Sequence, residues 1–120
     1  MAEKIIIAGS RSITDYQVLL KSVANIIDLN SSPEIVSGGA RGIDALAYMY
    51  ARENNLIFHE FKPQYRSNND RGAPLRRNVQ MANFGDRLVA IWNGQSLGTK
   101  HMIDTMAKLG KPVHIYMVQQ

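Results

Sequence analysis

Glycine and hydroxyl side chains follow three short apolar runs of the chain. They occur at residues 9–11 (GSR), 37–42 (SGGARG) and 93–99 (NGQSLGT). Because glycine has no Cβ, the backbone N–H groups of such a turn, and of the first turn of a following helix, can approach phosphate oxygens closely. Each segment taken alone is equally consistent with a tight strand-to-helix turn. Three segments that meet at one edge favour a binding site for a phosphate group.

Arginines accompany these segments. Guanidinium groups bind phosphate oxygens through paired hydrogen bonds, so arginines at the same edge are consistent with an anion site. The alternative is that exposed arginines only keep the surface soluble, and this interpretation is favoured for Arg41 and Arg71. The arginines in or beside the expected loops are Arg11, Arg41, Arg71, Arg76 and Arg77.

Asp44 and Trp92 each allow two interpretations. Asp44 lies in the first turn of an expected helix, where a carboxylate interacts favourably with the helix dipole whether or not it has another role. A functional Asp44 would accept a hydrogen bond from a ribose hydroxyl or act as an acid or base. Trp92 ends an expected strand, where its indole would either stack on a base or close the top of the core.

The sequence lacks the motifs of several common cofactor, nucleotide and metal sites. The spaced glycines of the dinucleotide fingerprint do not follow Gly9, and the phosphate loop that ends in Gly-Lys-Ser/Thr is missing. The chain contains no cysteine, and its three histidines show no metal-ligand spacing, so we predict no metal site and no required cofactor.

Strands and helices alternate along the chain. Continuous apolar runs predict buried strands, and apolar residues at helical spacing predict helices with one buried face. The loop at residues 62–74 is long, and loops of that length are commonly functional in compact domains. The expected strands are 4–8, 34–37, 56–61, 86–92 and 112–117, and the expected helices are 16–29, 43–54, 75–83 and 97–109.

This order predicts the α/β class, as a minimal Rossmann-like three-layer domain with a five-stranded parallel sheet. The length of 120 residues suits one domain spanning residues 1–120. The formal net charge of +4 favours anionic partners. The start of the chain lacks the apolar length of a signal peptide, and no apolar run approaches that of a membrane span. We therefore expect a cytoplasmic protein that has no membrane partner.

The motifs together resemble the SLOG superfamily, especially its YspA/YpsA-related branch, over nearly the whole chain. The resemblance implies the same fold and a nucleotide-type site. The segments that carry it are GSR with ITDY, VSGGARGIDALA, GAPLRRNVQM, DRLVAIWNGQSLGTKHMID and GKPVHIY.

Two groups related to this superfamily imply different activities. The LOG phosphoribohydrolases resemble the chain at Arg77 and at residues 96–102, but Met102 occupies the position of their catalytic glutamate. A thioether cannot transfer protons, so N-glycosidic hydrolysis would need Asp44 or Asp104 instead. The core of the DNA-processing protein DprA resembles the chain at residues 36–44 and at Arg77-Asn78, which implies single-stranded DNA, although Val79 replaces the second arginine of its pattern.

Two functions follow as expectations, and a third alternative is a structural or adaptor domain that keeps the fold without the site. The first is binding of a small nucleotide or nucleotide-derived phosphate compound, as a sensor or sequestering module or as an N-glycosidic hydrolase, with Arg77 and Asp44 as catalytic candidates. The second is binding of single-stranded nucleic acid, for which only Tyr65 and Trp92 would supply stacking rings. Methionine-rich helices also predict a homodimer. The predicted ligand-binding residues are Gly9, Ser10, Arg11, Ser37, Gly38, Gly39, Gly42, Asp44, Arg77, Asn78, Trp92, Gly94, Ser96, Gly98 and Thr99.

Overall fold

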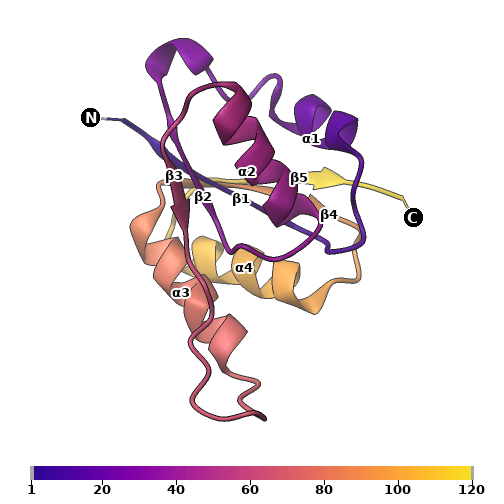
Figure 1. The fold of residues 1–120 in the computed structure, drawn as a ribbon, viewed down its shortest axis with the longest axis vertical. Coiled ribbons are helices and arrows are strands. Elements are labelled where there is room, and N and C mark those ends of the chain that lie inside the picture. The colour runs from indigo at the N-terminus through magenta and orange to yellow at the C-terminus, as the bar shows by residue number, and fades with distance from the viewer. Residues whose placement is uncertain (1, 120) are drawn as a thin grey trace.

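The computed structural model describes residues 2–119 and shows a parallel sheet with helices on both faces (Figure 1). This confirms the expected three-layer α/β fold. The strands are β1 (Lys4–Gly9), β2 (Glu34–Ser37), β3 (Phe58–Glu60), β4 (Arg87–Trp92) and β5 (Val113–Met117). The helices are α1 (Tyr16–Val23), α2 (Ile43–Glu53), α3 (Ala73–Phe84) and α4 (Leu97–Lys108), with a short 3₁₀ helix η1 (Leu29–Ser31).

Strand β1 lies at the centre of the sheet, whose order is β3-β2-β1-β4-β5. Ile6 pairs with Val36 of β2 on one side and with Leu88 of β4 on the other. All neighbouring strands are parallel, so their carboxyl ends share one edge. Because both faces of β1 are covered, its residues form a continuous apolar run.

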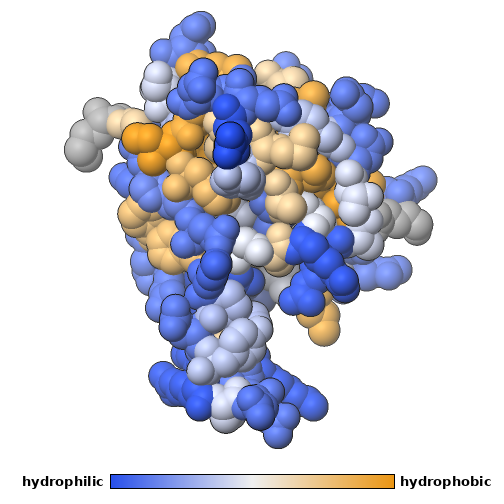
Figure 2. All heavy atoms as spheres, in the orientation of Figure 1, coloured by the Kyte–Doolittle hydropathy of each residue, from blue (hydrophilic) through white to orange (hydrophobic). Residues whose placement is uncertain are grey.

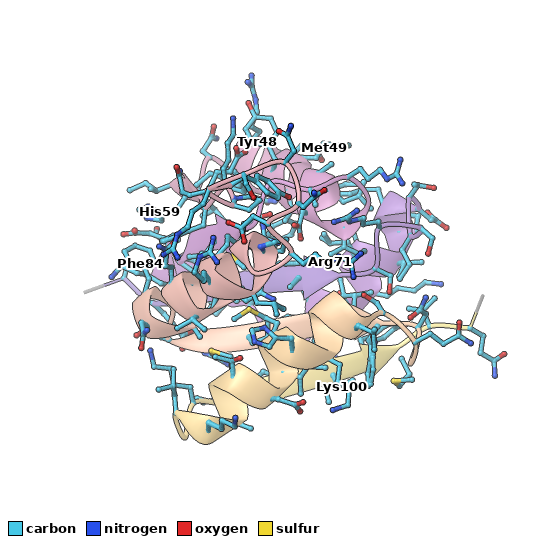
Figure 3. The ribbon with its side chains drawn as sticks, turned by 90° about the horizontal axis from the view of Figure 1, so that it is seen from below. Tyr48, Met49, His59, Arg71, Phe84 and Lys100 are labelled. Carbon is cyan, nitrogen blue, oxygen red and sulfur yellow. The ribbon has the colours of Figure 1, made fainter. Side chains whose placement is uncertain are left out.

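Alternate residues of β1 belong to two separate cores. Ile5 and Ile7 pack in the core under α1 and α2, whereas Ile6 packs with residues of α3 and α4. This alternation follows from the two-residue period of a strand. Figure 1 shows α3 and α4 below the sheet and α1 and α2 on its other side, and Figure 3 views the molecule from below, with α3 and α4 in front.

The structure corrects two helix boundaries. Helix α1 ends at Val23 and not at residue 29, because Asp28 starts a competing local structure in which its carboxylate accepts from the N–H of Asn30 at 3.0 Å. Helix α3 begins at Ala73 and not at residue 75, since Pro74 in the first turn needs no hydrogen-bond donor there. Strand β3 is also shorter than expected and covers three residues of the predicted run 56–61.

Capping residues define the start of α1 and the end of α4. Asp15 caps α1 by accepting from the N–H of Gln17 at 3.0 Å. Gly110 follows α4 with a φ of +70°, the left-handed conformation that glycine allows at a helix end. Among the described residues, no helix combines the length and the hydropathy that a membrane span requires.

A prediction about stability concerns Gly9, the last residue of β1, which lies close to β4 and α2. A Cβ at this position would lie 2.4 Å from the carbonyl oxygen of Ile91 and 2.7 Å from Cγ1 of Ile43. Gly9→Ala should therefore lower the free energy of unfolding by about 1–3 kcal/mol, as overpacking does. The measurement is denaturant unfolding.

Gly98→Ala is the matched control, because a Cβ there meets nothing within 4 Å. It should leave stability unchanged or raise it by up to about 1 kcal/mol. Equal effects of the two substitutions would contradict the packing argument.

Candidate functional site

A cleft with two adjoining lobes lies at the carboxyl edge of the sheet. The smaller lobe has a volume of about 90 Å³ and the larger lobe about 500 Å³. The smaller lobe is lined by Ala8, Gly9, Arg11, Ala40, Asp44, Pro74, Leu75, Arg77, Asn78, Met81, Ser96, Gly98, Thr99 and Met102. The larger lobe is lined by Arg11, Gly38, Gly39, Ala40, Arg41, Lys62, Pro63, Tyr65, Pro74 and Arg77.

Turns from different parts of the chain form these walls. The turns after β1, β2 and β4 and the start of α3 all reach the smaller lobe. The segment between β3 and α3 supplies the outer wall of the larger lobe through Lys62, Pro63 and Tyr65. Arg11 and Arg77 line both lobes, so two guanidinium groups mark the place where the lobes meet.

Arg77 is held by backbone carbonyls. Its Nη1 donates to the oxygen of Gly38 at 2.6 Å and to that of Phe61 at 3.3 Å, and its Nε donates to Oδ1 of Asn78 at 3.1 Å. Burial lowers the pKa of Arg77, and the neighbouring Asp44 carboxylate opposes that shift. The guanidinium therefore has a fixed position while one side of it still faces the cleft.

Asn78 connects α3 to the start of α4. Its Nδ2 lies 3.3 Å from the carbonyl oxygen of Gly98 and 3.2 Å from Nδ1 of His101. Burial lowers the pKa of His101, which favours the neutral ring whose Nδ1 accepts this hydrogen bond. Asn78 thus sets the distance between the two helices that flank the smaller lobe.

Asp44 is a buried acid in the wall of the smaller lobe, with 7% of its surface exposed. Its Oδ2 accepts from the N–H of Ala40 at 3.1 Å. Burial raises the pKa of Asp44 to about 6, although that hydrogen bond and the nearby Arg77 and Arg11 favour the charged form. An acid with such a pKa exchanges its proton near neutral pH and can also accept a hydrogen bond from a sugar hydroxyl.

The start of α4 brings hydroxyls to the smaller lobe. Ser96 is the N-cap, and its Oγ accepts from the N–H of Thr99 at 3.4 Å and lies 3.1 Å from Oγ1 of Thr99. Gly98, between them, leaves open space where a side chain would otherwise stand. This first turn presents hydroxyls and backbone N–H groups to the cleft, with the positive end of the helix dipole behind them.

Ten predicted site residues line the cleft. They are Gly9, Arg11, Gly38, Gly39, Asp44, Arg77, Asn78, Ser96, Gly98 and Thr99. The glycine-rich turns therefore do open onto one cleft.

Five predicted site residues lie outside the lining of both lobes. The indole Nε1 of Trp92 donates to the carbonyl oxygen of Ser96 at 3.0 Å, so this ring supports the turn before α4. The Ser37 hydroxyl is fully buried and bonds to the backbone of Asp44 at 3.2 Å. The Ser10 N–H donates to the carbonyl oxygen of Ile91 at 3.2 Å, a Cβ at Gly42 would lie 2.4 Å from the carbonyl oxygen of Arg11, and Gly94 has a φ of +80°.

The arginines separate into different roles. Arg41 lines the larger lobe, whereas Arg71 lines neither lobe. Arg76 forms an ion pair with Asp70 at 2.5 Å, and its Nη2 also donates to the carbonyl oxygen of Gln64 at 3.2 Å. Its guanidinium therefore fixes the loop before α3 and does not line the cleft.

Sequence reasoning did not assign Lys62, Tyr65 or Ala40 to the small-ligand site, although all three line the cleft. The length of the loop at 62–74 was the signal that could have identified the first two, since long ordered loops are often functional. Within residues 2–119, no three His, Asp or Glu side chains gather in a way that would hold a metal ion.

A parallel sheet with a glycine-lined cleft at its carboxyl edge defines a Rossmann-like protein with a site at the usual position for that fold. The chain belongs to the YspA, cpYpsA-related SLOG family (YAcAr), whose model matches residues 3–67. This confirms the resemblance that the sequence motifs indicated. No curated protein sequence matches the chain.

Solved structures share the fold. DNA processing protein A (DprA) from Streptococcus pneumoniae superposes with a TM-score of 0.75 at 21% identity, over 95% of this chain and 50% of that one. DprA from Helicobacter pylori, described for its single-stranded DNA binding mode, gives 0.71 at 23% identity over 94% and 64%. The structural genomics target TM1055 gives 0.69 at 19% identity over 92% and 72%. The chain thus spans half to just under two thirds of the DprA chains.

A prediction concerns the stability contributed by Asp44. Because its pKa is raised from 3.8 to about 6 in the folded protein, its contribution is fully present below about pH 4 and is lost as pH rises through about 6. The shift corresponds to at most about 3 kcal/mol. The Asp44→Asn side chain does not titrate, so the variant does not lose this contribution. The free energy of unfolding of the variant relative to that of the wild type should therefore increase as pH rises from about 4 to about 7.5.

Denaturant unfolding of both proteins at several pH values measures this difference, and titration of the other groups cancels in the comparison. A stability difference that stays constant with pH would show that Asp44 does not titrate with a raised pKa.

Proposed function

We propose that the cleft binds a nucleotide or nucleotide-derived phosphate compound, with the phosphate where the two lobes meet. The observation that carries this proposal is the position of Arg11 and Arg77, which line both lobes. The open first turn of α4, at Gly98, lies in the wall of the smaller lobe. Guanidinium groups and a helix N-terminus are the donors that proteins commonly use for phosphate.

The charge around the cleft supports an anionic ligand. Arg41 and Lys62 add to the positive charge of the larger lobe, with Glu60 pairing to Lys62 at 3.5 Å. Asp44 opposes an anion when it is ionised; with a pKa of about 6 it is largely ionised at pH 7 and takes its neutral form as pH falls below about 6. An anion at the junction would favour that neutral form further.

The lining of the smaller lobe favours binding over hydrolysis. Met102 is buried in that lining, with 1% of its surface exposed, and offers no group that can transfer a proton. Asp44 is the carboxylate that lines the lobe among the described residues. We therefore propose a sensor or sequestering role, with Asp44 and Arg77 as the residues that any hydrolytic activity would use.

Single-stranded DNA is the second candidate, and the fold shared with the DprA proteins supports it. A strand needs a track of cations and several stacking rings. Here Arg76 is engaged by Asp70, and Tyr65 is the aromatic residue in the lining of the two lobes. These features favour a single nucleotide unit over a strand.

Calorimetry with a panel of nucleoside phosphates tests the first candidate. Arg11→Ala should weaken binding about 10- to 100-fold, the usual effect of losing a hydrogen bond to a charged group. The matched control is Arg52→Ala, which removes the same charge from the last turn of α2, away from the cleft. Equal affinities of both variants and the wild type would contradict the proposed position of the phosphate, and silence across the panel would contradict the function.

Chromatography of the same nucleotides after incubation with the protein separates binding from hydrolysis. We expect the nucleotides to be recovered intact. A released base would show that the protein is an N-glycosidic hydrolase.

Salt dependence separates the two candidate ligands. A nucleotide held by Arg11 and Arg77 should lose affinity only modestly with added salt, and oligothymidine should bind no more tightly than the nucleotide. Fluorescence anisotropy with labelled ligands at several salt concentrations measures both. Tight oligothymidine binding with a steep salt slope would establish the strand as the ligand.

A further inference from the structure

We propose that the larger lobe is a nucleobase subsite in which Tyr65 stacks on the base, and that the Asp70–Arg76 ion pair positions Tyr65. This inference rests on the proposed function and adds the part of the ligand that the larger lobe would recognise. Four observations carry it: the anchoring of the loop, the exposure of the ring, the shape of the facing wall and the position of the cations.

The loop between β3 and α3 is anchored by one carboxylate. Asp70 accepts from the N–H groups of Arg66 at 2.9 Å and Gly72 at 3.1 Å. It also accepts from Arg76, through Nη1 at 3.3 Å and Nη2 at 2.5 Å. The same Nη2 donates to the carbonyl oxygen of Gln64 at 3.2 Å. The hydrogen bonds from Arg76 lower the pKa of Asp70 to about 2, so its charge persists at neutral pH.

This anchoring acts directly on Tyr65, because both of its chain neighbours take part. Gln64 is held through its carbonyl and Arg66 through its N–H. The Tyr65 side chain itself is 60% exposed and lines the larger lobe. An exposed aromatic ring on an anchored backbone is partly preorganised for stacking, since the backbone that carries it is already ordered before binding.

Three of the four residues by which the turn after β2 lines the larger lobe have little or no side chain, and the fourth is Arg41. The three are Gly38, Gly39 and Ala40, and Gly39 has a φ of +73° that disfavours any other residue. Pro63 and Pro74 complete the apolar part of the lining. A volume of about 500 Å³ lies within the usual range for small-molecule sites. Backbone, prolines and one tyrosine offer a flat ring an apolar surface, and the same lining also contains the cations Arg11, Arg41, Lys62 and Arg77.

The cations determine which end of the ligand lies in this lobe. Arg11 and Arg77 line both lobes, while Arg41 and Lys62 line the larger lobe alone and Lys62 pairs with Glu60. A phosphate bound between Arg11 and Arg77 leaves the rest of a nucleotide to occupy the larger space. Figures 1 and 2 show the anchored loop extending below the sheet, with hydrophilic side chains over its tip. Pro63 and Tyr65 of this loop line the larger lobe.

The test compares a nucleoside monophosphate with ribose 5-phosphate, which carries the same phosphate and sugar but no base. Tyr65→Ala should weaken nucleoside monophosphate binding about 5- to 100-fold, the range that loss of one stacked ring produces. It should leave ribose 5-phosphate affinity unchanged. Tyr65→Phe keeps the ring and should bind both compounds almost as the wild type does. Calorimetry measures all three proteins.

Asp70→Asn tests the anchoring. The amide has the same size but loses the ion pair with Arg76, so Tyr65 should lose its fixed position. Nucleoside monophosphate affinity should fall toward that of Tyr65→Ala, and retained ribose 5-phosphate binding would show that the variant is folded. Unchanged nucleotide affinity in Asp70→Asn would overturn the positioning role.

The outcomes separate this inference from the proposed function. If nucleotide and ribose 5-phosphate both bind and Tyr65→Ala changes neither, the base subsite is wrong and the phosphate site stands. Equal weakening of both compounds by Tyr65→Ala would also overturn it, because the ring would then act on the phosphate or the fold. If the wild type binds neither compound, the proposed function fails, and the base subsite fails with it.

Discussion

The half-buried guanidinium of Arg77 is the interaction on which the site depends. By donating to the carbonyls of Gly38 and Phe61, it fixes the turn after β2 and the end of β3 relative to α3. A Cβ on residue 38 would lie 2.3 Å from Nη1, so this arrangement requires glycine there. The same guanidinium lines both lobes and lies near the Asp44 carboxylate. One side chain therefore contributes to both the shape and the charge of the cleft.

The fold was predictable because each element has a strong local signal. The apolar run at residues 5–7 favours a strand buried on both faces over an alternating surface strand, and strict alternation of strands and helices leaves a parallel sheet as the simple solution. The end of α1 was not predictable from periodicity, since Ile26 and Ile27 continue the apolar pattern beyond Val23. The local hydrogen bonds of Asp28 override it.

The glycine-rich turns predicted the place of the cleft, because the carboxyl ends of parallel strands must share an edge. They did not predict which side chains face it. Trp92 and Ser37 end strands as expected, yet both donate hydrogen bonds to backbone carbonyls. Arg76 and Arg77 are sequence neighbours with different roles, because successive helical residues point in directions about 100° apart. The contact of Arg76 with Asp70 depends on a loop without periodicity, which no pattern reveals.

The two cores on either side of β1 share no buried residue, so each helical layer packs against the sheet independently of the other. The cleft is where the layers come together at the surface: Asp44 begins the helix of one layer, while Arg77 and Ser96 belong to the other. A bound molecule would therefore act as a bridge between two otherwise separate packing units. Neither helical layer could then unfold locally unless the bound molecule dissociated first. Amide hydrogens in both layers would therefore exchange more slowly in the bound protein.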